Sequence, residues 1–304
     1  MALATPAPAP SCRPSAQPQP PLLPLLFVTG ASSGIGQALA WRFYQAGYRL
    51  ALVARRTQAI AQWAEQHALD PARYAIYAAD VTVPDSIIAA AHACIAAQGT
   101  PDVVIASAGI SHGIDTAERA DLCVMADIYA TNCLGLAATF HPFITPMRQR
   151  GSGTLVGIAS ITGIRGLPGH GAYCASKAAA ISYCESLRGE LRDADIQVTT
   201  LLPGYIDTPM TMHDTYARPF LLSPAQFAQR AYAAIAAGSS YRAIPWQMAI
   251  VAKLLRLLPN WLFDAALAGR PRKPRKITPN ANTPSANTPN PNAPSSHTQN
   301  THTP

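Results

Sequence analysis

The stretch TGASSGIG, residues 29–36, is the strongest indicator of the fold of this 304-residue chain. It follows the apolar run LLFV (25–28), and an Ala-rich helical pattern begins within it. Gly30 allows a tight turn, while Gly34 and Gly36 let the backbone approach a phosphate and let the helix pack closely on the strand. The helix N-terminus would offer free N–H groups to that phosphate. The stretch therefore predicts a nucleotide-binding strand–turn–helix unit, with an ordinary turn as the alternative.

Short apolar runs alternate with Ala-rich helical patterns along most of the chain. Runs of nearly continuous apolar residues are typical of parallel strands that are covered on both faces. The alternation predicts an α/β fold with a doubly wound parallel sheet (a Rossmann fold), in which ligands bind at the carboxyl ends of the strands. The predicted strands are 25–30, 49–56, 74–80, 102–109, 153–160 and 196–204.

Both ends of the chain differ in composition from the middle. Residues 1–24 are rich in Pro and Ala, and 270–304 are a basic cluster followed by Asn, Thr and Pro. Such segments have too few apolar side chains to offset the entropy lost on ordering, so we expect disordered tails. A single catalytic domain is predicted over 25–245, followed by an amphipathic helical segment at 246–269.

The net charge of +7 is concentrated at one place. Five cations lie in RPRKPRK (270–276), and removing them leaves +2 for the rest of the chain. This distribution does not favour a nucleic-acid-binding surface, and no nucleic acid is expected as a partner. The six cysteines have no metal-binding spacing, so we expect reduced thiols and no metal site. No secretory signal pattern begins the sequence, which favours a cytoplasmic location.

Tyr173 and Lys177 lie four residues apart in GHGAYCASKAAA (169–180). On a helix this spacing places both side chains on one face. Free tyrosine titrates near ~10, and a neighbouring ammonium group favours the phenolate and lowers that pKa. The pair therefore fits proton transfer at neutral pH, although the same spacing also occurs on solvated helix surfaces.

The combination of TGASSGIG, Ser160 at the end of a predicted strand, and Tyr173 with Lys177 resembles the short-chain dehydrogenase/reductase superfamily, in its compact single-domain branch. The resemblance extends from Leu25 to Arg218 and includes Asn132, in YATNCLG. It implies a catalytic tetrad of Asn132, Ser160, Tyr173 and Lys177. In this tetrad the tyrosine is the general acid and base, the serine holds the substrate oxygen, the lysine binds ribose, and the asparagine holds a water molecule.

The end of the second predicted strand bears on the choice of cofactor. Ala54 stands where an acid would bind the ribose 2′-hydroxyl of NAD, and Arg55 and Arg56 follow. Arginines can pair with a 2′-phosphate, so we expect NADP(H), with two solvated arginines as the alternative. The family's Asn-Asn-Ala-Gly turn is replaced by Ala-Ser-Ala-Gly at 106–109. The resemblance assigns cofactor contacts to Thr29, Gly30, Ser32, Ser33, Gly34, Ile35, Gly36, Arg55, Arg56, Asp80, Val81, Ala108, Gly109, Tyr173, Lys177, Pro203, Gly204, Ile206 and Thr208.

The implied reaction is hydride transfer between NADP(H) and a small molecule, interconverting a carbonyl and an alcohol. An apolar stretch at 209–222 occupies the position of the substrate lid, which indicates a hydrophobic ketone or alcohol. Its candidate substrate residues are Met210, Tyr216 and Phe220. The alternatives are a non-catalytic, cofactor-sensing regulator on the same fold, and a sugar-nucleotide epimerase or dehydratase.

The C-terminal segment leaves two interpretations open. Residues 246–276 combine an amphipathic helical pattern with the basic cluster, which fits weak contact with an anionic membrane. The protein would then be peripheral at the inner face of a membrane. The same segment fits a cover over the substrate pocket or a subunit contact. The resemblance also implies a homodimer or homotetramer formed through the helices that carry Asn132 and Tyr173.

Overall fold

The computed structural model describes residues 23–212, 217–269 and 272–275. The predicted tails beyond these limits, and Tyr216, lie outside the described residues. The strands are β1 (Leu25–Thr29), β2 (Arg49–Ala54), β3 (Tyr74–Ala78), β4 (Val103–Ala106), β5 (Gly153–Ile158), β6 (Ile196–Pro203) and β7 (Tyr241–Ile244). The α-helices are α1 (Gly34–Gln45), α2 (Thr57–Gln66), α3 (Pro84–Gln98), α4 (Asp121–Tyr129), α5 (Gly135–Arg150), α6 (Gly171–Glu190), α7 (Pro224–Ala236), α8 (Trp246–Leu257) and α9 (Asn260–Leu267).

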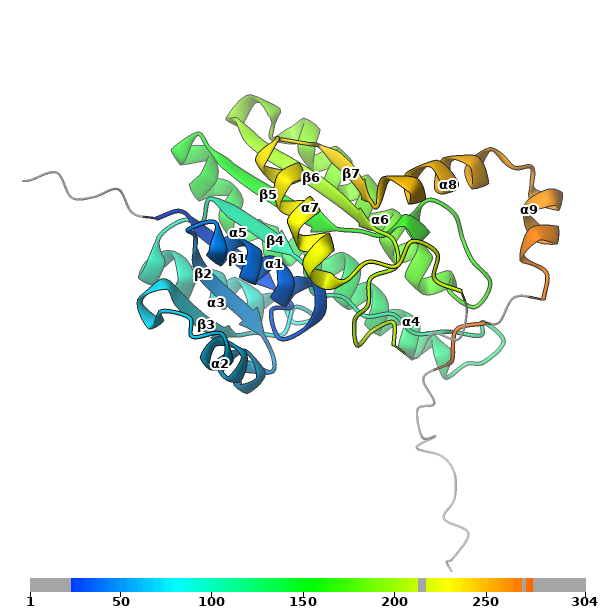
Figure 1. The fold of residues 1–304 in the computed structure, drawn as a ribbon, viewed down its shortest axis with the longest axis horizontal. Coiled ribbons are helices and arrows are strands. Elements are labelled where there is room, and N and C mark those ends of the chain that lie inside the picture. The colour runs from blue at the N-terminus through cyan, green and yellow to red at the C-terminus, as the bar shows by residue number, and fades with distance from the viewer. Residues whose placement is uncertain (1–22, 213–216, 270–271, 276–304) are drawn as a thin grey trace, which may run out of the picture.

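The strands form one sheet in the order β3-β2-β1-β4-β5-β6-β7, and every neighbouring pair is parallel. Helices cover both faces of this sheet (Figure 1). Because β1 lies between β2 and β4, the direction of winding reverses there, and a crevice opens at the carboxyl ends of β1 and β4. The prediction of a doubly wound parallel sheet is confirmed.

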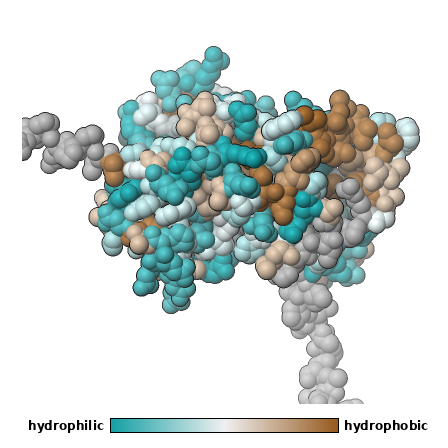
Figure 2. Space-filling view, viewed as in Figure 1, coloured by the Kyte–Doolittle hydropathy of each residue, from teal (hydrophilic) through white to brown (hydrophobic). Residues whose placement is uncertain are grey.

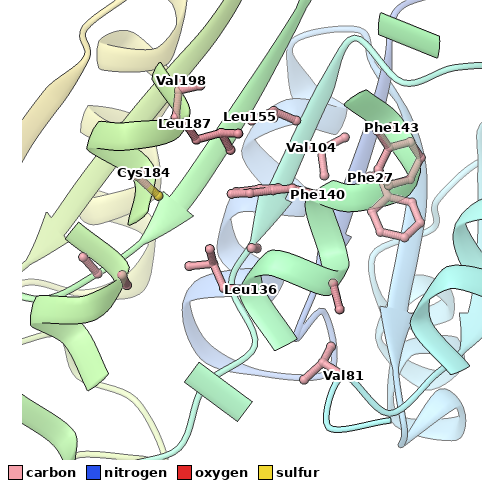
Figure 3. Packing of buried hydrophobic residues seen from close by; sticks show 14 of the residues in the cluster. Phe27, Val81, Val104, Leu136, Phe140, Phe143, Leu155, Cys184, Leu187 and Val198 are labelled. Atoms are coloured by element: carbon pink, nitrogen blue, oxygen red, sulfur yellow. The ribbon is translucent and has the colours of Figure 1, made fainter. Parts of the chain in front are cut away.

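Alternating residues of the strands supply two hydrophobic cores, one on each face. In β1, Leu25 and Phe27 belong to one core, whereas Leu26 and Val28 belong to the other. Figure 3 shows the first core, where Phe143 from α5 packs against Phe27 and the two ring centroids are 4.7 Å apart. Burying a large apolar side chain contributes about 1.5–3 kcal/mol, so these faces hold the helices in place.

The observed strands differ from the predicted ones in two ways. Strand β7 was not predicted, because it has only four residues and its first two, Tyr241 and Arg242, are exposed at the edge of the sheet. All six predicted strands also end later than the observed ones, four of them by two or three residues. Their apolar runs continue into loops that leave the sheet, and these loops carry Arg55, Asp80 and Ser160.

The helical stretch from α4 to α5 is long and apolar enough, by length and composition, to cross a membrane. It runs from Asp121 to Arg150 and includes one turn of π-helix, η2 (Ala130–Leu134). Phe140, Phe143 and Met147 on this stretch are fully buried in the protein core. Packing against the sheet therefore explains its apolar composition.

The C-terminal helices are attached to the loop that follows β5. The Arg165 guanidinium donates hydrogen bonds to the carbonyl oxygens of Leu255 and Leu258, the latter at 2.8 Å, and to Asn260 Oδ1 at 3.1 Å. It also stacks over the Phe263 ring, 3.8 Å from its centroid. One arginine thus holds both α8 and α9.

Residues 272–275, which composition assigns to a disordered tail, instead contact the domain. Arg275 donates two hydrogen bonds to the buried carboxylate of Asp121, at 2.7 and 3.1 Å. The Pro274 carbonyl accepts a hydrogen bond from the Gly113 N–H at 3.1 Å. This pairing lowers the pKa of Asp121, chiefly through the hydrogen bonds from Arg275, and so keeps the carboxylate charged.

Two matched leucine substitutions test the description of the core. Leu155 in β5 is fully buried, whereas Leu122 in α4 is 53% exposed. We expect Leu155→Ala to lower the free energy of unfolding by about 2–5 kcal/mol, because it removes buried methyl groups and leaves a cavity. Leu122→Ala should change it by less than about 0.5 kcal/mol. Urea unfolding followed by circular dichroism measures both, and equal losses would contradict the assignment of Leu155 to the core.

Candidate active site

The glycine loop is closely packed at the crevice. Gly30 has a φ of 72°, and an added Cβ there would lie 3.0 Å from the backbone of Ala108. A Cβ on Gly36 would lie 2.4 Å from the carbonyl oxygen of Gly30. Ser33 is the N-cap residue of α1, and within the described chain its side chain does not cap the helix. The first N–H groups of α1 thus remain available for a pyrophosphate, so the loop fits a dinucleotide.

Thr29 connects the glycine loop to the turn after β4. Its hydroxyl donates to the Ile105 carbonyl at 3.5 Å and accepts from the N–H groups of Ser107 and Ala108, at 3.1 and 3.3 Å. This turn lacks the two asparagines of the family pattern. The buried Thr29 hydroxyl supplies hydrogen bonds that hold it in place.

The two arginines after β2 have different partners. Arg56 donates from one guanidinium nitrogen to the hydroxyls of Ser32 and Ser33, at 3.2 and 3.3 Å. Arg55 instead forms an ion pair with Asp80 at 3.5 Å. Desolvation raises the pKa of Asp80, but hydrogen bonds from Thr82 and the charge of Arg55 outweigh it and lower the pKa overall. The Arg56 guanidinium therefore lies beside the glycine loop, whereas the Arg55 guanidinium lies beside the loop that follows β3.

Ser160 lies two residues after the end of β5, in the same cleft as Tyr173 from α6. The Ser160 hydroxyl accepts hydrogen bonds from the Thr162 hydroxyl at 3.0 Å and from the Thr162 N–H at 3.3 Å. Thr162 was not predicted as a site residue. Its position two residues after the serine is the only signal of this role in the sequence. It leaves the Ser160 proton free to be donated to a ligand oxygen.

Lys177 lies one helical turn after Tyr173, and its Nζ is 5.8 Å from the centroid of the tyrosine ring. Lys177 is 5% exposed, and its ammonium group donates to the Ile158 carbonyl at 2.8 Å. Desolvation is the main cause that lowers the pKa of Lys177 to about 8. The hydrogen bond therefore holds the side chain in place at the cleft, with a pKa about one unit above neutral pH.

Asn132 occupies the π-helical turn η2 and joins three elements. Its Oδ1 accepts from the Ile110 N–H at 2.9 Å, while its Nδ2 donates to the Ile110 carbonyl at 3.0 Å and to the Ser176 hydroxyl at 2.9 Å. Ser176 in turn donates to the Tyr173 carbonyl at 2.8 Å. A π-helical turn is a frequent feature of functional sites. Here it binds the loop after β4 to the helix that carries the tyrosine.

The loop after β6 forms the far side of the cleft. The Gly204 N–H donates to the Ile244 carbonyl at 2.8 Å, and a Cβ on Gly204 would lie 2.9 Å from the side chain of Met248. Thr211, which was not predicted, donates from its hydroxyl to the Ile206 carbonyl at 2.6 Å and closes the turn that carries Thr208. Helix α8 therefore begins directly behind this wall.

Most of the predicted site residues line this one cleft. Asn132 and Thr29 lie behind its surface and support it. Phe220, predicted as a substrate residue, is 49% exposed and does not line the cleft; it lies in a turn where its φ is 57°. The predicted residues that line the cleft are Gly30, Ser32, Ser33, Gly34, Ile35, Gly36, Arg55, Arg56, Asp80, Val81, Ala108, Gly109, Ser160, Tyr173, Lys177, Pro203, Gly204, Ile206, Thr208 and Met210.

The buried position of Lys177 predicts a pH dependence of stability. Its pKa falls from 10.5 to about 8 on folding, so between these values the unfolded chain binds more protons than the folded one. The free energy of unfolding should therefore rise with pH across this window. We expect Lys177→Met to remove this contribution, as measured by urea unfolding of the cofactor-free protein. The same rise in wild type and variant would show that the lysine is not desolvated.

Comparison with known proteins identifies the family. Residues 25–218 match the family model described as short chain dehydrogenase. An uncharacterized oxidoreductase of Myxococcus xanthus is 35% identical over 79% of this chain and 94% of its own length. Dehydrogenase/reductase SDR family member 7B of Bos taurus is 33% identical over 83% of this chain and 82% of its own length.

A solved structure supports the fold. A short-chain dehydrogenase/reductase from Burkholderia phymatum, in complex with NAD, superposes with a TM-score of 0.69 at 22% identity, covering 84% of this chain and 98% of that one. Because the family model spans both the glycine loop and the Tyr173–Lys177 pair, the chain belongs to the short-chain dehydrogenase family of oxidoreductases.

Proposed function

We propose that this protein interconverts a carbonyl and an alcohol by hydride transfer, with NADP(H) as its cofactor and a hydrophobic molecule as its substrate. The observation that carries the proposal is the convergence of Ser160, Tyr173 and Lys177 on the cleft that the glycine loop lines. During reduction a carbonyl oxygen gains negative charge and a proton. The two hydroxyl groups can donate hydrogen bonds and a proton to it, and the buried cation can stabilise the charge that develops.

The chain's own residues have separate roles in this reaction. A nicotinamide cofactor, when bound at the glycine loop, would supply the hydride in reduction and accept it in oxidation. The Ser160 hydroxyl donates to the substrate oxygen, and Tyr173 gives that oxygen its proton. When protonated, Lys177 stabilises the tyrosinate through its charge. Asn132 holds the loop after β4 and α6 at a constant separation, which keeps these groups aligned.

The preference for NADP(H) is supported by residues of this chain and not by the fold. The family relative from Burkholderia phymatum is a complex with NAD, so the fold itself does not select the phosphate. Ala54 offers no carboxylate to a ribose 2′-hydroxyl. Arg56 is directed to Ser32 and Ser33, next to the glycine loop, where a 2′-phosphate could accept its hydrogen bonds.

The substrate and the assembly are proposed from exposed apolar surface. Met210 brings a thioether to the substrate end of the cleft, which supports a hydrophobic ketone or alcohol. We also propose a homodimer through the helices of Asn132 and Tyr173. These helices expose Leu134 and Tyr183, which are large apolar side chains that a subunit contact would cover.

Tyr173→Phe tests the chemical role of the tyrosine. Removing the hydroxyl eliminates the proton donor but keeps the ring, so we expect kcat for ketone reduction to fall about 10²–10⁴-fold. The loss of NADPH absorbance with a panel of hydrophobic ketones measures the rate. NADPH binding, followed by fluorescence, should be retained.

Tyr183→Phe is the matched control for this variant. Tyr183 lies on the same helix, ten residues later, and its side chain is 37% exposed. We expect it to keep the wild-type rate. Wild-type turnover by Tyr173→Phe would disprove the proposed mechanism.

Replacing both arginines tests the cofactor preference. In Arg55→Gln with Arg56→Gln, the 2′-phosphate would lose its charge-assisted hydrogen bonds. We expect the ratio of kcat/KM for NADPH over NADH to fall by about tenfold or more, mainly through KM for NADPH. Arg192→Gln removes a positive charge from an exposed site near the start of β6 and should leave the ratio unchanged. An unchanged ratio in the double variant would overturn the preference for NADP(H).

A further inference from the structure

Helix α8 has apolar side chains on two opposite faces. Met248 and Ala252 are buried against the domain. On the other face Trp246, Ile250, Leu254 and Leu257 are between 49% and 80% exposed. These four are spaced by three or four residues, so they form one continuous row along the helix. A helix with apolar side chains on two opposite faces normally has both faces covered. In α8, the face of Trp246, Ile250 and Leu254 is left exposed.

Helix α9 extends this exposed surface. Trp261, in the first turn of α9, is 72% exposed, although Phe263 and Leu267 on the same helix are buried. Figure 2 shows a strongly hydrophobic surface in the region of α8, at the end of the molecule where α8 and α9 project from the domain in Figure 1. We call Trp246, Ile250, Leu254, Leu257 and Trp261 the apolar row. It begins and ends with tryptophan, the residue that is enriched at membrane interfaces.

Two cations lie beside the apolar row. Lys253 is on the same exposed side of α8, and Arg256 is one turn further along. Arg256 donates to the Ile164 carbonyl at 3.3 Å. Neither cation forms an ion pair with an acid in the described residues, and between positions 246 and 269 the sequence contains one acid, Asp264. An anionic partner is therefore complementary to this surface.

A second copy of the chain is a less suitable partner. A two-fold contact through the apolar row would bring Lys253 and Arg256 of one copy toward the same cations of the other. Like charges that face each other across an interface are unfavourable. A bilayer with anionic lipids is complementary to both the apolar row and the two cations. Its acyl region would cover the apolar side chains, and its headgroups would pair with the cations.

We propose that the apolar row, with Lys253 and Arg256, is a docking surface for anionic lipid bilayers. It lies close to the substrate end of the cleft: Met248 of α8 lies behind Gly204, and Arg256 bonds to the loop that follows Ser160. A docked bilayer would therefore lie next to the entrance for hydrophobic substrates. Lipid binding is independent of the proposed hydride transfer, because it requires neither cofactor nor substrate.

Flotation of the full-length protein with vesicles tests this proposal. The vesicles are phosphatidylcholine alone or phosphatidylcholine with phosphatidylglycerol. We expect wild type to float with both and more strongly with the anionic ones. Ile250→Gln, Leu254→Gln and Leu257→Gln in combination should weaken binding to anionic vesicles by more than about tenfold, because the buried apolar area is lost. Lys253→Gln with Arg256→Gln should weaken it by about fivefold per cation and leave binding to neutral vesicles unchanged.

The matched control is Val83→Gln with Leu122→Gln, which replaces two exposed apolar side chains elsewhere on the domain and should leave flotation unchanged. If the triple variant unfolds in a thermal melt, the charge variant decides the question. Absence of wild-type flotation, or full flotation of the triple variant, would overturn the proposal. So would a dimer, detected by light scattering without lipid, that the triple variant abolishes, since a second copy would then cover the row.

Discussion

The close contact between α1 and β1 is the constraint on which the rest of the site depends. At Gly36 an added Cβ would lie 2.4 Å from the Gly30 carbonyl, so no larger residue fits without moving the helix. This contact brings the N-terminus of α1 beside the carboxyl ends of the paired strands β1 and β4. Thr29 then ties the turn after β4 to the same place. One packing contact thereby positions both the floor of the cleft and the N–H groups that would meet a phosphate.

The proposed catalytic groups depend on a second rigid unit, centred on the buried Lys177. Its ammonium group is held by the Ile158 carbonyl at the end of β5, and burial lowers its pKa to about 8. Asn132 connects the neighbouring loop to the same helix through Ser176. Burying a positive charge without an acidic partner lowers the free energy of unfolding. Such buried charges are concentrated at functional sites. Held in this position, the Lys177 cation would be available to Tyr173 and to a bound cofactor in the proposed reaction.

The surface at the glycine loop is polar, whereas the surface formed by α8 and α9 is largely apolar. Near the glycine loop, arginines and serines converge, and the exposed surface suits a phosphate. Beyond the end of the cleft that holds Ser160 and Tyr173, α8 and α9 present tryptophans and leucines to solvent, although Arg165 fixes both helices to the domain. A polar cofactor and a hydrophobic partner would thus approach from different sides, which separates the two binding events in space.

Local patterns along the chain were sufficient to predict the parallel sheet, the glycine loop and the Tyr173–Lys177 pair. Glycine spacing, apolar runs and the four-residue helical repeat act over a few residues, so they are visible without a structure. Partners distant in sequence were not visible. Thr29 bonding to Ser107, Asn132 bonding to Ile110, and Arg275 pairing with Asp121 arise only when the chain folds. The order of residues specifies which chemical groups the protein has. Folding selects which of those groups come into contact, because hydrogen bonds and burial depend on distances that only packing sets.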